Sequence, residues 1–399
     1  MAAPSSARTA AVRKASSGMS LRFGFVSTYP PTQCGLATFT ASLSSALTAS
    51  GSDVAQVVRL LESPQPPAGP DVVGDVVAGD PVSLARSLPR LNACDVVVVQ
   101  HEFGIFGGPD GDEVLTLLAG LTVPSIVVLH TVLTDPSAHQ REVLEAVVEI
   151  AGSVVCMTDT AHRRLLAGYR VVPDKVSVIA HGAPDLLAAG GRPTARPGPS
   201  HRPTVLTWGL LGPGKGIEWA VRAMAELRDL RPAPRYLVVG QTHPKVLAHQ
   251  GEVYRRGLID LAADLHLSDT VELDGRYLDG PSLAAVVSSA DVVLLPYDST
   301  EQVTSGVLIE AVAAGKPVVA TRFPHAIELL ATGAGVLVPQ RDPANIAAAL
   351  RRVLTDRPAA AAMARTAAAA APGLRWSAVA DEYRQVAMRL LASAETVAA

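Results

Sequence analysis

Short runs of β-branched and other apolar residues alternate along this chain with segments of helix length. In the first half these runs are LRFGFVST, AQVVRLL, DVVVVQ, SIVVLH, SVVCMT and KVSVIAH. Strands that are apolar on both faces and separated by helix-length segments are typical of a parallel sheet covered by helices on both sides. The first half therefore predicts an α/β domain.

The alternation breaks once and then resumes. It stops at LAAGGRPTARPGPSHRP (187–203), whose Pro, Gly and Arg content is typical of a linker. The runs that follow are TVLTWGL, RYLVVGQ, VELDGRY, DVVLLPY, PVVATR and GVLVP, with helices expected near 216–229 and 250–265. The predicted organisation is a disordered tail (1–20), a first domain (21–190), a linker (191–203), a second domain (204–374) and an amphipathic C-terminal helix (375–399).

Composition excludes several classes of protein. The chain has 399 residues, 48% of them hydrophobic, and a net charge of −3 without a long basic run, so a nucleic-acid partner is not expected. Cys34, Cys94 and Cys156 are widely spaced, which suggests neither a disulfide framework nor a zinc site and favours a cytoplasmic location. No apolar run reaches the length of a transmembrane helix, and the first twenty residues lack the apolar core of a signal peptide.

Ligands of open α/β sheets bind beyond the carboxyl ends of the strands. Two such domains joined by a flexible linker would place these ends opposite each other across a cleft. The first strand leads into STYPPTQCGLATF, where Gly35 precedes a helix whose N-terminus would favour an anion such as phosphate, although a plain turn explains one glycine equally well. The loop lacks G-x-G-x-x-G, which argues against a dinucleotide oxidoreductase.

A second glycine-rich loop, TWGLLGPGKGIEWAV, carries Lys215 between a strand and a helix. It is not a Walker loop, because Gly216 stands where that motif needs Ser or Thr. Flexible glycine backbone beside one cation favours a cradle for a diphosphate over an ordinary loop lysine.

Several polar side chains follow strands of the first half. His101 and Glu102 are candidates for recognising hydroxyl groups, with structural roles as the alternative. His130 and His181 also close strands, and for each a structural hydrogen bond competes with a function. The Asp-Gly-Asp triplet at 110–112 matches a D-x-D metal motif, but three letters occur too easily by chance, so no metal site is predicted.

Taken together, these segments resemble the retaining nucleotide-sugar glycosyltransferases of family 4, which have the GT-B fold of two Rossmann-like α/β domains facing a central cleft. The segments that carry the resemblance are the PP-x-x-CG loop, LH at 129–130, VIAHGAPD at 178–185, GLLGPGKGIE at 209–218, ADVVLLPY at 290–297, GVLIEAVAAGKPVVAT at 306–321 and the final RWSAVADEY. The resemblance covers nearly the whole chain, and it implies that the last helix returns to the first domain.

The resemblance also implies roles for particular residues. It implies that Gly35 belongs to a phosphate-binding loop and that His130 lies near the donor sugar. It also implies that Lys215 binds the donor diphosphate and that Glu310 binds the ribose. His101 and Glu102 would lie on the acceptor side. The remaining donor-binding candidates are Gly209, Gly214, Thr304, Ser305, Gly306, Val307 and Leu308, the last five through backbone amides at a helix start.

Two positions depart from the family pattern. Leu210 stands where the family has an arginine, and Arg276 or Arg322 is expected to supply the missing charge. The first carboxylate of the E-x₇-E signature should stand eight residues before Glu310, where this chain has Gln302, with Glu301 one residue away. Either residue could fill that place, since a neutral amide also hydrogen-bonds sugar hydroxyls.

The expected function is transfer of a hexose from a nucleotide-diphospho-sugar to a hydroxyl acceptor on a glycan, lipid or small molecule, with retention and without metal or cofactor. The alternatives are a GT-B phosphorylase or epimerase, and a non-catalytic sugar-nucleotide-binding subunit. The basic stretch AHRRLLAGYRVV gives a faint indication of peripheral membrane contact, but a solvated helix end explains it better. The sequence names neither the base, nor the sugar, nor the acceptor.

Overall fold

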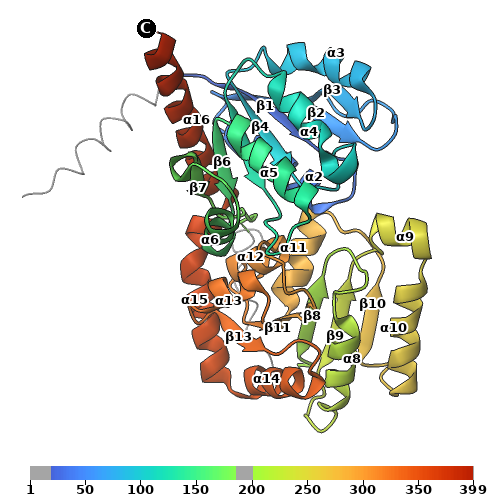
Figure 1. Ribbon diagram of the computed structural model, residues 1–399. Coiled ribbons are helices and arrows are strands. Elements are labelled where there is room, and N and C mark those ends of the chain that lie inside the picture. The colour runs from blue at the N-terminus through green and yellow to red at the C-terminus, as the bar shows by residue number, and fades with distance from the viewer. Residues whose placement is uncertain (1–18, 186–200, 399) are drawn as a thin grey trace, which may run out of the picture. The chain divides into compact units, whose positions relative to one another are not determined.

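The computed structural model describes residues 19–185 and 201–398. The predicted tail up to residue 18 and the predicted linker over 191–200 lie outside the described residues. The described chain forms two compact units (Figure 1). The N-terminal unit contains residues 19–157, 161–179 and 379–398, and the C-terminal unit contains 158–160, 180–185 and 201–378.

The N-terminal unit is built on a seven-stranded parallel sheet. Its strands are β1 (Arg22–Ser27), β2 (Val54–Leu61), β3 (Val72–Val77), β4 (Val96–His101), β5 (Ser125–Leu129), β6 (Ser153–Cys156) and β7 (Val176–Val178). Their order is β3-β2-β1-β4-β5-β6-β7, and every pairing is parallel. The chain reverses direction across the sheet between β1 and β4, which is where open α/β sheets bind ligands.

Helices connect these strands. They are α2 (Gly35–Thr48), α3 (Pro81–Leu91), α4 (Glu113–Ala119), α5 (Ala138–Ile150) and α6 (Asp159–Gly168), with α16 (Trp376–Ala398) added from the end of the chain. Figure 1 draws α16 in dark red beside β6 and β7. Its residues Val379, Tyr383 and Ala387 are buried at the spacing of one helix face.

The C-terminal unit repeats the architecture with six parallel strands. They are β8 (Thr204–Trp208), β9 (Arg235–Val239), β10 (Val271–Asp274), β11 (Val292–Leu295), β12 (Val318–Thr321) and β13 (Gly335–Val338), in the order β10-β9-β8-β11-β12-β13. The helices are α8 (Ile217–Ala225), α9 (Pro244–Gln250), α10 (Val253–Asp264), α11 (Gly280–Ser289), α12 (Gly306–Ala313), α13 (Pro324–Leu330), α14 (Pro343–Thr355) and α15 (Arg357–Leu374). The prediction of two parallel-sheet α/β domains is confirmed.

Apolar residues on both faces of each sheet form the cores. All four residues of β11 are buried, and α12 packs against α15 through small and apolar side chains. Such burial is worth roughly 25 cal/mol per Å² of apolar surface, so the β-branched strand runs contribute strongly to folding. Among the described residues, no helix is long and apolar enough to cross a membrane.

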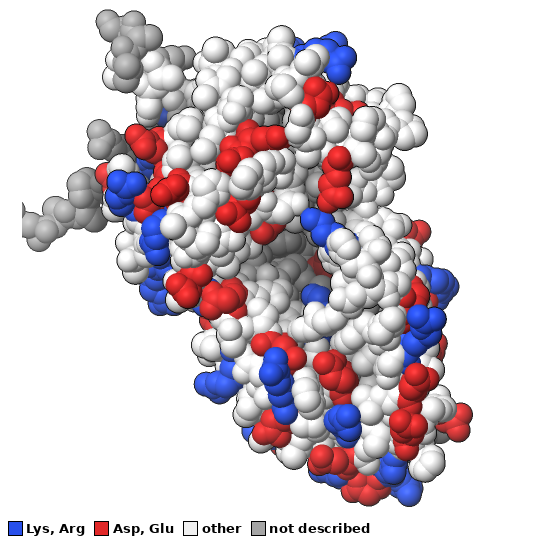
Figure 2. All heavy atoms as spheres, turned by 45° about the vertical axis from the view of Figure 1, so that its right-hand side comes forward, with Lys and Arg blue, Asp and Glu red and all other residues white. Residues whose placement is uncertain are grey.

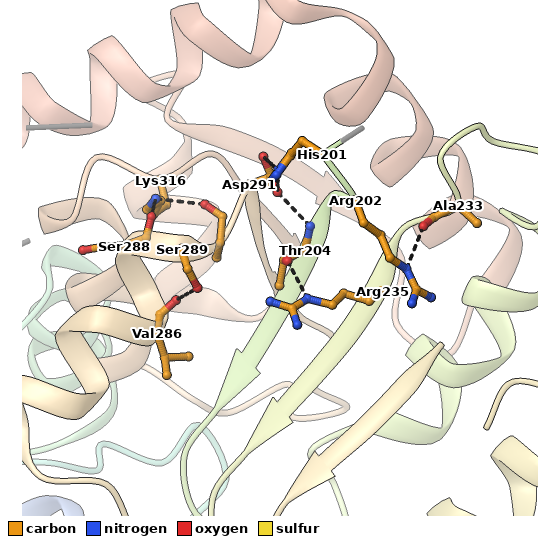
Figure 3. Close-up of polar contacts among 11 residues, drawn as sticks. His201, Arg202, Thr204, Ala233, Arg235, Val286, Ser288, Ser289, Asp291 and Lys316 are labelled. Carbon is orange, nitrogen blue, oxygen red and sulfur yellow. Dashed lines mark hydrogen bonds and ion pairs between the residues drawn. The ribbon is translucent and has the colours of Figure 1, made fainter. Parts of the chain in front are cut away.

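Polar contacts fix the amino-terminal edge of the C-terminal sheet (Figure 3). Asp291, just before β11, accepts from His201 and from the backbone N–H of Thr204 at 2.7 Å. Lys316 donates to the carbonyl oxygens of Ser288 and Ala290 at 2.7 and 2.8 Å. These contacts lie at the edge of the sheet opposite the carboxyl ends of the strands. They stabilise the fold, and the ligand-binding edge is formed by other residues.

Candidate active site

Two elements of the C-terminal unit meet at the carboxyl edge of its sheet. The glycine loop 209–216 follows β8, and α12 follows the adjacent strand β11. A Cβ placed on Gly209 would lie 3.6 Å from Val307 Cγ2, so the loop and the start of α12 are in contact. A flexible loop and a helix N-terminus both suit phosphate, so their contact forms one continuous edge that could accept an anion.

Lys215 is the cation of this edge. Its Nζ lies 4.5 Å from the centroid of the Tyr297 ring, and Tyr297 stacks on Phe323. Burial lowers the pKa of Lys215, because protein atoms replace water around the ammonium group. The side chain is therefore pre-positioned by a cation–π contact and poorly solvated, so a bound anion would interact with it strongly.

The loop reaches this position only because residue 216 is glycine. Gly216 has φ of +64°, and a Cβ there would lie 1.8 Å from the carbonyl oxygen of Pro296. The neighbouring backbone N–H of Asp298 donates to the carbonyl oxygen of Gly214 at 2.9 Å. These contacts pack the loop that carries Lys215 against the end of β11.

The N-terminus of α12 is held by two buried side chains. Ser305 caps the helix, since its Oγ accepts from the N–H of Leu308 at 3.3 Å. His325 Nδ1 accepts from the N–H of Ser305 at 2.8 Å, and burial lowers the pKa of this histidine to about 3, so it is neutral. Within the described chain, the N–H groups of Gly306 and Val307 have no hydrogen-bond partner.

His181 packs on the same helix start. A Cβ on Gly306 would lie 3.0 Å from the His181 ring, which excludes a larger residue at 306 unless the ring moves. His181 Nδ1 lies 2.6 Å from the carbonyl oxygen of Gly182, and burial lowers the pKa of the ring to about 4. A neutral histidine with this contact supports the structural interpretation of His181.

Glu310 lies one turn inside α12 and faces β8. Its Oε2 accepts from Trp208 Nε1 at 3.1 Å. The residue keeps some exposed surface, yet burial of its carboxyl group raises the pKa to about 7. A carboxylate in such a site gains from further donors, and the two hydroxyls of a ribose would supply them.

Glu301 and Gln302 lie in the irregular segment before α12. Glu301 is exposed, whereas Gln302 is half-buried and donates from Nε2 to the carbonyl oxygen of Thr304 at 3.1 Å. The N–H groups of both residues donate to Ser299 Oγ. Thr304 Oγ1 is buried without a partner among the described residues.

No contact links the candidate replacement arginines to Lys215 in the described part of the chain. Arg276 is 75% exposed and pairs with Asp274 at 2.6 Å. Arg322 is exposed in the turn after β12. The position of the family arginine, Leu210, is half-buried. The structure therefore brings together Lys215, Glu310 and the α12 amides, and does not add either arginine to them.

The carboxyl edge of the N-terminal sheet carries the other candidates. His130 Nε2 lies 2.7 Å from Gln100 Oε1, and its ring meets Phe39 edge-on. Glu102 Oε2 accepts from Thr131 Oγ1 at 2.5 Å. These contacts orient His130 and Glu102 at the ends of neighbouring strands β5 and β4.

His101 and Gly35 differ from these residues. His101 is only 1% exposed and its Nδ1 has no partner among the described residues, while burial lowers its pKa to about 4. Gly35 is the first residue of α2, and no atom lies within 4 Å of the position its Cβ would take. Open space at that point is compatible with a ligand close to the backbone.

The side chains of the Asp-Gly-Asp triplet are contacted by residues of the neighbouring helix α5. His139 on α5 lies 3.0 Å from Asp110 and 3.7 Å from Asp112. Gln140 donates to the other oxygen of Asp110 at 3.2 Å. Among the described residues, no group of three or more His, Cys, Asp or Glu side chains has the geometry of a metal site.

Comparison with known proteins places this geometry in a family. Residues 202–356 match the family described as "Glycosyl transferases group 1". The matched residues lie within the C-terminal unit. The glycine loop, Lys215 and α12 all lie within the matched glycosyltransferase segment.

Two relatives of this chain are named D-inositol 3-phosphate glycosyltransferases. The protein of Stackebrandtia nassauensis is 34% identical over 271 residues, which cover 65% of this chain and 60% of that protein. The protein of Kineococcus radiotolerans is 33% identical over 61% of this chain and 59% of its own length. The chain thus aligns with less than two thirds of each relative.

Solved structures confirm the GT-B fold. A sucrose-phosphate synthase from Thermosynechococcus elongatus has a TM-score of 0.73 at 21% identity, with 94% of this chain and 100% of that one covered. Anabaena HepE in complex with UDP and glucose has a TM-score of 0.69 at 17% identity, with 92% and 99% covered.

Sequence reasoning missed several residues that shape both edges. Gln100 and Trp208 close strands and hold His130 and Glu310, and their signal was a polar or aromatic residue at the end of an apolar run. Tyr297 contacts Lys215 and His325 contacts Ser305, although the two residues of each pair are far apart in the sequence. Sequence spacing gave no sign of these contacts.

Proposed function

We propose that this protein is a retaining glycosyltransferase that moves a hexose from a nucleotide-diphospho-sugar to a hydroxyl acceptor. The observation that carries the proposal is the grouping of Lys215, the open amides of α12 and the Glu310 carboxyl at one edge of a sheet. HepE, which shares the fold, has been solved with UDP and glucose, and this supports a nucleotide sugar as the donor.

The reaction breaks the bond between the anomeric carbon and a phosphate oxygen, and the departing diphosphate takes the electron pair. Lys215 and the N–H groups of Gly306 and Val307 would stabilise that charge. Each preorganised donor of this kind is worth on the order of 2–4 kcal/mol at the transition state. With these groups supplying positive potential, we propose that the reaction requires no metal.

Glu310 would hold the nucleoside part. Its ionised carboxylate accepts from Trp208 Nε1 and would accept from the ribose hydroxyls, which fixes the nucleotide relative to the diphosphate. Tight positioning matters because the anomeric carbon must lie within about 3–3.5 Å of the attacking oxygen.

The N-terminal unit would supply the acceptor side. We propose that Glu102, oriented by Thr131, binds an acceptor hydroxyl there, and that His130, oriented by Gln100, lies near the donor sugar. Retention would follow from attack on the face that the diphosphate leaves. In that step the acceptor oxygen bonds to the anomeric carbon, and the leaving phosphate oxygen takes the acceptor proton.

Thermal shift with UDP-, GDP- and ADP-sugars, followed by calorimetry, tests the proposal. We expect one nucleotide series to raise the melting temperature, and Lys215→Ala to weaken binding of that nucleoside diphosphate by about 10- to 100-fold, the value of a charge-assisted hydrogen bond. No stabilisation by any of these nucleotides, with Lys215→Ala behaving as the parent, would refute the donor site.

Lys316→Ala is the matched control for that variant. Lys316 is also partly buried in the C-terminal unit, but it donates to two carbonyl oxygens at the amino-terminal edge (Figure 3). We expect this variant to lower the melting temperature while nucleotide affinity stays unchanged. Equal loss of affinity in both variants would show that destabilisation, and not the missing phosphate contact, explains the result for Lys215.

A further inference from the structure

The N-terminal unit contains an apolar pocket at the carboxyl edge of its sheet. The pocket has a volume of about 230 Å³. Its lining residues are Leu60, Val76, Ala78, Asp80, Pro81, Leu84, Ile105, Phe106, Gly107, Glu113, Thr116 and Leu117. They come from the ends of β2 and β3, the starts of α3 and α4, and the loop after β4. This is the edge at which open α/β sheets bind ligands.

The loop after β4 joins the pocket to the proposed acceptor residues. Glu102 opens this loop, and its backbone neighbour Phe103 donates to the Glu102 carboxylate at 3.2 Å. Ile105 and Phe106, three and four residues further on, form one wall of the pocket. A molecule whose hydroxyl lies at Glu102 could therefore extend along the loop into the pocket.

The two carboxylates of the pocket are already used by the backbone. Glu113 accepts from the N–H of Gly79 through both oxygens, at 3.0 and 3.1 Å. Asp80 accepts from the N–H of Val82 at 2.9 Å and caps α3. Because these contacts fix both carboxylates in the wall, the surface left for an occupant is mainly hydrocarbon.

The charged side chains of the loops around the pocket are acidic, and the nearby Arg59 is buried and paired with Asp75. The loops that follow β1 to β5 (27–34, 62–71, 78–80, 102–112 and 130–137) all lie in the described chain and contain no Lys or Arg. Their charged residues are Glu62, Asp71, Asp80, Glu102, Asp110, Asp112 and Asp135. Figure 2 shows several groups of acidic side chains on the face of this unit that it draws. An anionic ligand in the pocket would be repelled by these carboxylates.

From the pocket and this charge, we infer that the acceptor is uncharged and carries an apolar aglycone, an alkyl or aryl group, that fills the pocket. The inference rests on the proposed function, because it assigns the pocket to the acceptor of that reaction. It also separates this chain from its relatives, whose name specifies an inositol phosphate. The acidic loops favour an uncharged acceptor over a phosphate-bearing one.

Calorimetry without turnover tests the inference directly. The probes are n-octyl β-D-glucopyranoside below its micelle concentration, methyl β-D-glucopyranoside, and inositol 3-phosphate. We expect the octyl glycoside to bind at least about tenfold more tightly than the methyl glycoside, since burial of two methylene groups is enough for that factor. Inositol 3-phosphate should not bind more tightly than the methyl glycoside.

A blocking variant locates the site. Thr116 is an exposed residue of α4 that lines the pocket, so the large ring system of Thr116→Trp can occupy the pocket from its rim. Ala119→Trp, at an exposed position of the same helix outside the lining, is the control. We expect Thr116→Trp to remove the preference for the octyl glycoside, and Ala119→Trp to keep it.

The outcomes separate the two proposals. Equal binding of octyl and methyl glycosides, persistence of the octyl preference in Thr116→Trp, or tightest binding of inositol 3-phosphate each overturns the inference. Nucleotide binding and its dependence on Lys215 are measured independently, on the other unit. If the nucleotide binds but the octyl preference is absent, only the acceptor assignment fails; if no nucleotide binds, the proposed function fails.

Discussion

The buried position of Glu310 disfavours the ionised form of its carboxyl group. Burial raises its pKa to about 7, and Trp208 donates one hydrogen bond to it. Binding of ribose hydroxyls would favour the ionised form, so the pKa should fall when the nucleotide binds. The proton would then be released on binding.

This gives a prediction of pH dependence. Above pH 7 Glu310 is already ionised and nucleotide affinity should be constant, whereas below pH 7 affinity should fall, approaching about tenfold per pH unit as ionisation becomes the limiting step. Calorimetry in buffers of different ionisation enthalpy measures the released proton. In Glu310→Gln the proton release should vanish; a pH profile unchanged by this substitution would contradict the assignment.

The first carboxylate position of the family signature is the second prediction at this scale. Gln302 is half-buried and its amide is held by the Thr304 carbonyl oxygen, while Glu301 is exposed. We therefore expect Gln302→Ala to reduce turnover by at least about tenfold, the effect of one lost hydrogen bond at a reacting centre. Glu301→Ala, its neighbour, should change turnover little. Steady-state rates at saturating donor decide between them, and the reverse order would assign the place to Glu301.

The residues proposed to carry the chemistry were easier to select from the sequence than the residues that contact and position them. Lys215, His130 and Glu310 stand at strand ends or a helix start, and the local pattern was enough to select them. Gln100 and His325 act on residues 30 and 20 positions away in the chain, and only the sheet order and the loop packing bring them together.

At the scale of elements, Gly216 determines where the lysine loop lies. Gly216→Ala would put a Cβ 1.8 Å from the Pro296 carbonyl oxygen at a φ of +64°, so the loop must shift. We expect a loss of about 1–3 kcal/mol in the free energy of unfolding, typical of backbone strain, together with weaker nucleotide binding. Chemical denaturation and calorimetry on the same samples measure both quantities.

Gly257→Ala provides the comparison for that substitution. Gly257 is exposed in the middle of α10, and no atom lies within 4 Å of its Cβ position. Alanine there should increase stability by about 0.5–1 kcal/mol through helix propensity and leave nucleotide affinity unchanged. If Gly216→Ala proved as well tolerated, the proposed packing of the lysine loop against β11 would be wrong.

Most elements were predictable because a buried parallel strand is apolar on both faces. The strand β3 was missed, and its residues explain why. Gly74 and Asp75 interrupt its apolar run, the glycine because it packs against Ser87 of α3 and the aspartate because it pairs with buried Arg59 at 2.9 Å. The glycine and the aspartate in this edge strand are explained only by the side chains that they contact in the folded protein.

At the scale of the whole molecule, residues 379–398 complete the N-terminal unit. Arg384 on α16 pairs with Asp53 at 2.7 Å and also donates to the carbonyl oxygen of Met19. The Asp53 side chain is 1% exposed and further accepts from the N–H of Leu21. A charge pair this buried ties the start of the first sheet to the last helix.

Breaking this pair should destabilise the N-terminal unit strongly. Arg384→Ala leaves the Asp53 carboxylate buried without its cation, and we expect the free energy of unfolding to fall by about 3–5 kcal/mol. Arg389→Ala, at an exposed position of the same helix, should cost less than about 1 kcal/mol. Denaturant unfolding compares the two, and equal losses would show that the pair contributes nothing specific.

The membership of α16 in the N-terminal unit also sets an order of events during synthesis. Residues 379–398 emerge from the ribosome after the whole C-terminal unit, although they cover strands made more than 200 residues earlier. Domains generally fold from the N-terminus as the chain is made. The N-terminal unit therefore cannot be completed before the C-terminal unit has been translated, so its β6–β7 side stays uncovered until residues 379–398 are made and would be an early binding site for chaperones.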